Sequence, residues 1–216
     1  MYLNDATDKE VGHMSPENPT PKQVERRSRI LEAAAHEMLD MRDDRTAVDR
    51  IAARAGTSKA TIYRYFGDKT GLERAMVAWL CERARDPLEG VMVWPHNPRK
   101  TLLAIAEAFA DGILRAPVMN VHRYVVARTP THPELGEIFW DAGPEATYQT
   151  ATKLVTQIHL PAHLRVIAPR QFAELFLNML TSSIQLGYFC KGPVVLEKDD
   201  MGQRIEDAVT AFGFPP

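Results

Sequence analysis

The chain has 216 residues, of which 45% are hydrophobic and 25% charged, and its formal net charge is -2. These are ordinary globular values, and no uninterrupted apolar run approaches the roughly 20 residues of a membrane-spanning helix, so the composition excludes a disordered chain and predicts no membrane span. The net charge also excludes an evenly basic chain, so any nucleic-acid binding must come from a local surface.

The first 21 residues hold one lysine, four acidic residues and three prolines, with few apolar side chains. We expect residues 1–21 to form a disordered N-terminal arm. The opening residues lack the basic-then-apolar order of a signal peptide, which predicts a cytoplasmic protein. Cys81 and Cys190 are far apart in the sequence, which fits a reducing compartment.

Three short helices are predicted next. Apolar residues at steps of three and four predict a helix over 23–41, and the polar turn 42–45 leads to Thr46, a suitable cap for a second helix that ends near Ala55. Gly56 tolerates the positive φ of a turn, and Ser58 can cap a third helix from residue 59 to about residue 65. A turn this tight forces the second and third helices to cross steeply, as in a helix-turn-helix.

The third helix has a surface suited to DNA. We expect Ala60 and Ile62 to pack on the preceding helix, leaving cations, a hydroxyl and phenols outside. Lysine and arginine neutralise phosphates, and Thr61 near the helix start is the best candidate to contact a base edge. Charge supports this, because residues 22–86 hold fourteen Lys and Arg against eleven acidic residues, whereas the flanking segments are both net acidic. The alternative is an ordinary solvated helix pair.

The rest of the chain also shows helical patterns. A fourth helix carries Leu72 and Met76 on its buried side and should end near residue 85, because the following Asp86-Pro87 disfavours its continuation. Further helical segments follow over 102–113, 118–128, 133–158, 169–190 and 201–212, the third of them bent or split at Gly143-Pro144. No alternating strand pattern of useful length occurs, so the fold class is all-α.

The stretch 46–72 resembles the TetR family of bacterial transcriptional regulators. The matching residues are Thr46, Ile51, Ala52, Ala55, Gly56, Ser58, Lys59, Thr61, Tyr63, Tyr65, Phe66, Lys69 and Leu72. Thr57 departs from the valine that is usual in the family. The resemblance implies a DNA-binding head over residues 22–86, joined by its fourth helix to a helical ligand-binding and dimerisation domain over residues 87–216. The DNA-binding residues it predicts are Thr46, Ser58, Lys59, Thr61, Tyr63, Arg64, Tyr65 and Lys69.

In the C-terminal half, the stretch 123–148 resembles the corresponding part of AcrR-like and AefR-like repressors of the same family. By position, the last two helices of this half resemble the pair that joins two subunits in a four-helix bundle, which implies a homodimer on a near-palindromic double-stranded DNA operator. The candidate interface residues are Phe172, Phe176, Met179, Leu180, Ser183 and Gly187.

A small-molecule effector is expected in the same half, although its identity is not predicted. Polar or aromatic side chains within apolar segments are the candidates to orient a mostly apolar ligand, with packing in the core as the alternative for each. They are His122, Tyr124, Trp140, Tyr148, Asn178 and Gln185.

Catalysis and cofactors have no support in the sequence. There is no glycine-rich phosphate loop and no nucleophile elbow, and we expect neither an enzyme nor a bound cofactor or metal. His159 and His163 have the spacing of a helical metal pair, but the intervening Pro161 favours a loop. A redox role for either cysteine is a minor alternative.

The sequence thus predicts a homodimeric DNA-binding repressor that a small, largely apolar ligand releases from its operator. Two alternatives stay open. One is an activator or a DNA-binding protein without an inducer, and the other is a helical ligand-binding module that has lost DNA binding.

Overall fold

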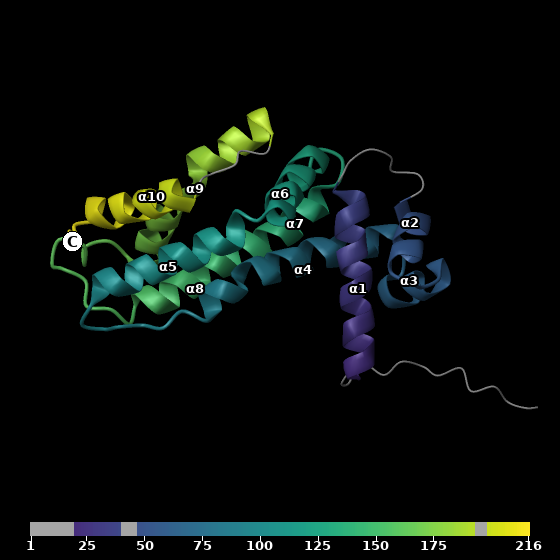
Figure 1. Cartoon of the computed structure of the whole chain (residues 1–216), viewed down its shortest axis with the longest axis horizontal. Helices are drawn as coiled ribbons and strands as arrows, with labels where there is room; N and C mark the ends of the chain where they lie inside the picture. The colour runs from purple at the N-terminus through teal and green to yellow at the C-terminus, as the bar shows by residue number, and fades with distance from the viewer. Residues whose placement is uncertain (1–19, 40–46, 193–197) are drawn as a thin grey trace, which may run out of the picture.

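The computed structural model describes residues 20–39, 47–192 and 198–216, and this part of the chain contains helices and no strands (Figure 1). The helices are α1 (Pro21–Met38), α2 (Ala47–Arg54), α3 (Lys59–Phe66), α4 (Lys69–Glu89), α5 (Pro98–Ile113), α6 (Ala116–Arg128), α7 (Pro133–Trp140), α8 (Ala146–Val155), α9 (Pro169–Lys191) and α10 (Lys198–Ala211).

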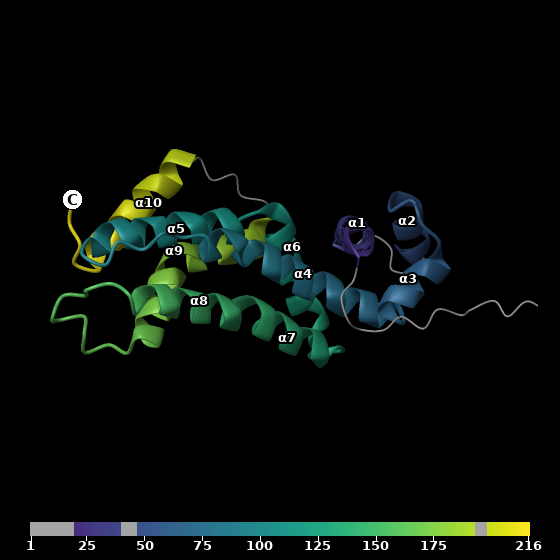
Figure 2. The same cartoon turned by 90° about the horizontal axis from the view of Figure 1, so that it is seen from below.

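Helices α1, α2 and α3 form a head at one end of an elongated molecule (Figures 1 and 2). Helix α1 begins two residues earlier than predicted, because Thr20 and Gln23 form a reciprocal capping box. The Glu37 carboxylate on α1 accepts hydrogen bonds from Arg54 Nε at 2.7 Å and from Arg50 Nε at 2.9 Å. These two bonds connect α1 to α2. Hydrogen bonding by these two guanidinium groups lowers the pKa of Glu37, with Arg54 the larger cause.

Helix α4 is the long connection between the head and the rest of the molecule. The predicted end near residue 85 is wrong, because α4 continues through Pro87 and ends at Glu89, with Gly90 as its C-cap. Pro87 stands in the last turn, where its missing amide removes only one hydrogen bond and Leu88 beyond it is still buried. At Gly112, α5 passes so close to α4 that an added Cβ would lie 1.9 Å from the carbonyl oxygen of Ala84.

The helix predicted over 133–158 was expected to bend or split at Gly143-Pro144, and the structure shows that it is split there. A π-helical segment, Asp141–Glu145, separates α7 from α8 and contains Pro144. Arg85 of α4 donates from Nη1 to the carbonyl oxygen of Ala142 in this segment, with 2.9 Å between the two atoms. This hydrogen bond therefore connects the π-helical segment to α4.

Two hydrophobic cores fill the described chain. One lies under the head and also includes Val121 and Tyr124 of α6 and Leu135 of α7. The other joins α5, α8, α9 and α10 around the stacked rings of Phe172 and Phe176. Contacts of the head core thus cross the predicted domain boundary at residue 86, because α6 packs on α1 and α4, and α7 packs on α4. No helix in the described ranges is both long enough and apolar enough to span a membrane.

Candidate nucleic-acid interface and ligand site

Helix α3 is fixed at both ends by local chemistry. The Ser58 side chain accepts a hydrogen bond from the Thr61 amide at 3.1 Å, which confirms the predicted cap. Gly56 and Gly67 have φ values of 61° and 81°, so the turns on both sides of α3 use the left-handed region that glycine favours. Ile62 is fully buried and anchors the helix on the head core.

The outward side of α3 carries Lys59, Ala60 and Arg64, which are all exposed. The prediction that Ala60 packs on the preceding helix is wrong, because Ile62 alone is buried within α3 and Ala60 lies on the outer side. The Ala60 methyl group therefore stands beside Thr61 as a second group able to contact the methyl group of a thymine. Sequence periodicity could not identify it, since alanine fits either side of a short helix.

Two predicted DNA contacts already have partners on the head. Lys59 Nζ lies 3.3 Å from an Asp49 carboxylate oxygen, but both side chains are about half or more exposed, so this pair is weak. The Thr61 hydroxyl lies 3.0 Å from the Ser58 hydroxyl. Because both contacts are solvent-accessible, a phosphate or base edge can replace them at low cost.

The phenols of the third helix have a double role. Tyr63 and Tyr65 are half-buried and pack against the head core, so their rings hold α3 in place. Lys69 is the first residue of α4 and is also partly exposed. Thr46 lies outside the described residues. The structure thus brings the remaining predicted DNA contacts together on α3 and at the start of α4, and they stay predictions as contacts.

The predicted ligand residues of α6 have different environments. Tyr124 is 3% exposed, and its hydroxyl donates to the carboxylate of Glu73 in α4, with 3.0 Å between the oxygens. His122 lies between the rings of Phe139 and Phe189, with centroid distances of 4.9 and 4.6 Å. Burial lowers the pKa of His122. Tyr124 is therefore part of a buried connection between α4 and α6 and does not face a cavity.

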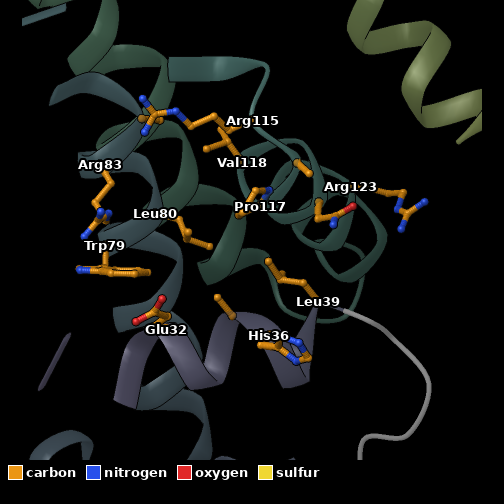
Figure 3. A pocket seen from close by; sticks show the side chains of 14 residues that line it. Glu32, His36, Leu39, Trp79, Leu80, Arg83, Arg115, Pro117, Val118 and Arg123 are labelled. Atoms are coloured by element: carbon orange, nitrogen blue, oxygen red, sulfur yellow. The ribbon is translucent and has the colours of Figure 1, made fainter. Parts of the chain in front are cut away.

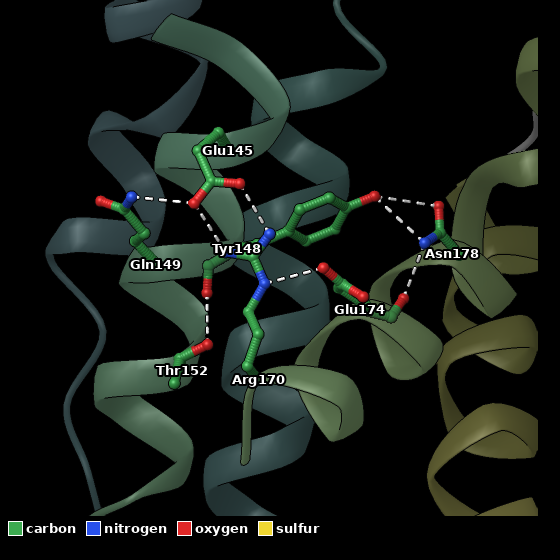
Figure 4. Close-up of polar contacts among 7 residues, drawn as sticks. All are labelled: Glu145, Tyr148, Gln149, Thr152, Arg170, Glu174 and Asn178. Carbon is green, nitrogen blue, oxygen red and sulfur yellow. Dashed lines mark hydrogen bonds and ion pairs between the residues drawn. The ribbon is translucent and has the colours of Figure 1, made fainter. Parts of the chain in front are cut away.

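Tyr148 and Asn178 do come together, in a polar cluster between α8 and α9 (Figure 4). The Tyr148 hydroxyl is 3.1 Å from Asn178 Nδ2. Arg170 donates two hydrogen bonds to the Glu145 carboxylate, from Nη1 to Oε1 at 3.0 Å and from Nη2 to Oε2 at 2.8 Å. Arg170 is the main cause of the lowered pKa of Glu145. This cluster fastens the first turns of α9 to the π-helical segment and α8.

The six predicted ligand residues do not share one cavity. Trp140 is 53% exposed, and Gln185 is half-buried. A cavity of about 770 Å³ lies between α1, α4 and the start of α6 (Figure 3). None of the six residues lines it or a second cavity, beside the segment 155–169.

The predicted dimer residues divide into two groups. Phe172, Phe176 and Leu180 are at most 1% exposed and belong to the core of a single chain, so their prediction as a contact surface is wrong. Met179 and Ser183 are exposed, and a Cβ built on Gly187 would meet nothing within 4 Å. The error has a physical reason: α9 is apolar on two sides, and the sequence does not say which one α10 covers.

The histidines and cysteines singled out in the sequence lie in different surroundings. His159 faces His96 and not His163, with 3.2 Å between the two Nδ1 atoms. No group of three or more His, Cys, Asp and Glu side chains suited to a metal occurs among the described residues. Burial raises the pKa of the Cys81 thiol to about 12, so Cys81 stays protonated and unreactive. Cys190 is exposed.

Helices α2 and α3, the capped turn between them and the long connection to a helical bundle define a helix-turn-helix protein with a separate helical domain. Residues 30–76 match the family model for bacterial regulatory proteins of the tetR family, and residues 100–213 match the model for the C-terminal domain of AefR-like transcriptional repressors. The chain belongs to the TetR family, with an AefR-like C-terminal domain.

Individual relatives agree with this assignment. The HTH-type transcriptional regulator BetI of Yersinia pestis is 30% identical over 115 residues, which are 51% of this chain and 57% of BetI. The chain thus spans little more than half the length of the curated relatives it matches. A TetR-family regulator from Mesorhizobium loti has the same fold, with a TM-score of 0.76 and 20% identity over 90% of this chain and 97% of its own. The flavonoid-responsive regulator FrrA gives a TM-score of 0.62 and 22% identity over 88% of this chain and 95% of its own.

Proposed function

We propose that this protein is a transcriptional repressor that binds a palindromic DNA operator as a homodimer in the cytoplasm and is released by a small molecule. The observation that carries the proposal is the outer side of α3, where Lys59, Ala60 and Arg64 are exposed on a helix capped by Ser58. Its position inside the tetR family match supports the same role.

In this mechanism α3 enters the major groove. Thr61 and Ala60 contact base edges, while Arg64, Tyr63 and Lys69 bind phosphates. Two heads must reach grooves about one helical turn apart, so the operator half-sites have that spacing. Because α4 runs from the head into the helical domain, a ligand that tilts α4 changes the separation of the heads.

The proposed dimer surface is the uncovered side of α9. Leu175, Met179 and Leu186 are 49%, 42% and 63% exposed and lie at helical spacing on this side. Large exposed apolar residues in a row are typical of a protein interface. This surface replaces the buried phenylalanines and retains Met179, Ser183 and Gly187 from the prediction.

The proposal that a ligand releases the protein from DNA is supported only by the similarity of its fold to that of FrrA. FrrA, which shares the fold, is named as a flavonoid-responsive regulator. We therefore extend to this chain only the class of effector, a small and largely apolar molecule.

The salt dependence of binding tests the proposal. The affinity for a random-sequence duplex is measured by fluorescence anisotropy at several salt concentrations, for the wild-type protein, Arg64→Gln and the remote control Arg165→Gln. Each lost phosphate contact reduces the slope of log affinity against log salt by about 0.9, so Arg64→Gln should reduce it by about 1.8 in a dimer. Absence of binding at low salt, or equal slopes in all three proteins, would contradict this role for α3.

A further inference from the structure

The groove between α1, α4 and the start of α6 has the size of a ligand site. Its volume of about 770 Å³ lies within the range of about 300–1,000 Å³ that is usual for small-molecule pockets. It is separate from every residue that the sequence predicted for ligand binding. It also differs in position, because α1 of the head supplies one wall.

The floor of the groove is apolar. Leu80 of α4, Leu39 after α1 and Pro117 and Val118 of α6 line it, and the Trp79 ring lies at its edge (Figure 3). Leu80 and Val118 are also buried in the protein. Such a floor favours a hydrocarbon chain or a fused aromatic ring over a polar metabolite.

The rim of the groove is basic. Arg83 and Arg115 lie on one side and Arg123 on the other, whereas Glu32 on α1 is the one carboxylate among the described lining residues (Figure 3). With His36 neutral, the described lining therefore carries an excess of two positive charges. An organic anion complements this charge, and a cation does not.

Two of the guanidinium groups are available to an anion. The Arg83 guanidinium carbon lies 5.0 Å from the centroid of the Trp79 ring. Arg115 uses its Nε to donate to the carbonyl oxygen of Asp111 at 2.7 Å, which leaves its terminal nitrogens directed elsewhere. Neither side chain forms an ion pair with another described residue. Guanidinium groups bind carboxylate, sulfonate and phosphate groups with two parallel hydrogen bonds.

We propose that this groove binds an amphipathic organic anion, with its apolar body on Leu80 and Val118 and its charged group between Arg83 and Arg115. The ligand bridges α1 of the head and α6, so it binds one orientation of the head better than others. Such a differential affinity shifts the equilibrium between head orientations. This regulatory consequence rests on the proposed function, because it requires a head that binds DNA.

The test uses 1-anilinonaphthalene-8-sulfonate, which has an anionic group on an apolar body, and its neutral analogue N-phenyl-1-naphthylamine. Both dyes are titrated into the full chain by fluorescence, without DNA. The proteins are the wild type, Arg83→Gln, Arg115→Gln and the matched control Lys153→Gln, which removes an exposed cation from α8.

We expect one saturable sulfonate site per chain. Each arginine variant should raise its Kd about tenfold, because each removes a charge-assisted contact. The control should keep the wild-type Kd, and the neutral dye should bind more weakly and equally to all four proteins. Decanoate should displace the sulfonate from the wild type, whereas decanol at the same concentration should not.

The proposal is overturned if the arginine variants bind the sulfonate as the wild type does, if Lys153→Gln weakens it as much, or if the neutral dye binds as tightly. Arg83 and Arg115 are exposed, so these variants should fold, and a circular dichroism melting curve checks this. A failure here leaves the salt dependence of DNA binding unchanged, so it is distinguishable from a failure of the proposed function.

Discussion

The hydroxyl of Tyr124 on α6 donates a hydrogen bond to the carboxylate of Glu73 on α4, and the two oxygens are 3.0 Å apart. Arg128 Nη2 adds a contact of 3.2 Å to the same carboxylate oxygen, and Glu73 is only 3% exposed. A buried carboxylate is expensive unless it is paired and hydrogen-bonded. This connection therefore holds the beginning of α4 against α6.

Removal of the Tyr124 hydroxyl should destabilise the fold. Tyr124→Phe takes a donor from the buried Glu73 carboxylate, and we expect a loss of about 1–3 kcal/mol in the free energy of unfolding. Urea denaturation measures the change. Tyr148→Phe is the matched control, because the Tyr148 hydroxyl bonds to an exposed asparagine and its loss should cost about 0.5 kcal/mol or less. Equal effects of the two variants would argue against a buried connection.

The burial of His122 predicts an acid-sensitive stability. Burial lowers its folded-state pKa below 6.5, so the unfolded chain binds a proton that the folded chain resists. Stability should therefore fall as the pH decreases from about 6.5 toward the lower folded-state pKa, and this contribution should vanish above that range.

Urea denaturation at several pH values compares the wild type with His122→Gln and with His163→Gln, which removes an exposed histidine. The pH dependence should become shallower in His122→Gln and stay unchanged in His163→Gln. An unchanged profile in His122→Gln would refute the role of His122.

The cap of α3 can be separated from DNA contact at the same residue. Ser58→Ala removes the acceptor of the Thr61 amide and should cost about 1 kcal/mol of stability. Ser58→Asn and Ser58→Asp preserve a cap, so both should retain stability. If Ser58 also faces phosphate, only Ser58→Asp should weaken DNA binding, through charge repulsion. Thermal unfolding and anisotropy give the two readouts, and equal DNA affinity of the asparagine and aspartate variants would place Ser58 away from the DNA.

A single charge introduced on the uncovered side of α9 should dissociate the dimer. Leu186→Asp places a carboxylate on a side chain that is 63% exposed, so the stability of one chain should change little while the dimer dissociates. Sedimentation equilibrium measures the assembly. Val166→Asp, at a side chain that is 84% exposed outside α9, should remain dimeric. A dimer that persists in Leu186→Asp would exclude this side of α9 as the interface.

Local signals in the sequence predicted much of the fold. The cap at Ser58, the positive φ at Gly56 and the interruption of the helix at Gly143-Pro144 depend on neighbouring residues alone, and the structure confirms all three. The helix end was placed too early at Pro87, because the local sequence does not show that Leu88 beyond it is buried in the C-terminal core.

Features that depend on tertiary packing were not predictable from patterns. The burial of Glu73 depends on α6, which covers it, and no local pattern around residue 73 indicates this contact. Phe172 was predicted at the dimer interface, but it lies in one core with residues of α10 of the same chain, and the ring of Phe212 packs on it. The groove beside Arg115 joins residues from α1, α4 and α6 that are far apart in the sequence.

The most direct test of the central claim is selection of DNA from a random duplex pool by the purified protein, with Tyr63→Ala in parallel. The bound fraction is recovered over several rounds and sequenced. We expect a palindrome whose half-sites are about one helical turn apart, and its enrichment should disappear with Tyr63→Ala. If dimeric, folded wild-type protein enriches no sequence, α3 is not the DNA-reading helix and the proposed function is contradicted. If Tyr63→Ala enriches the same palindrome as strongly, Tyr63 is not one of the DNA contacts.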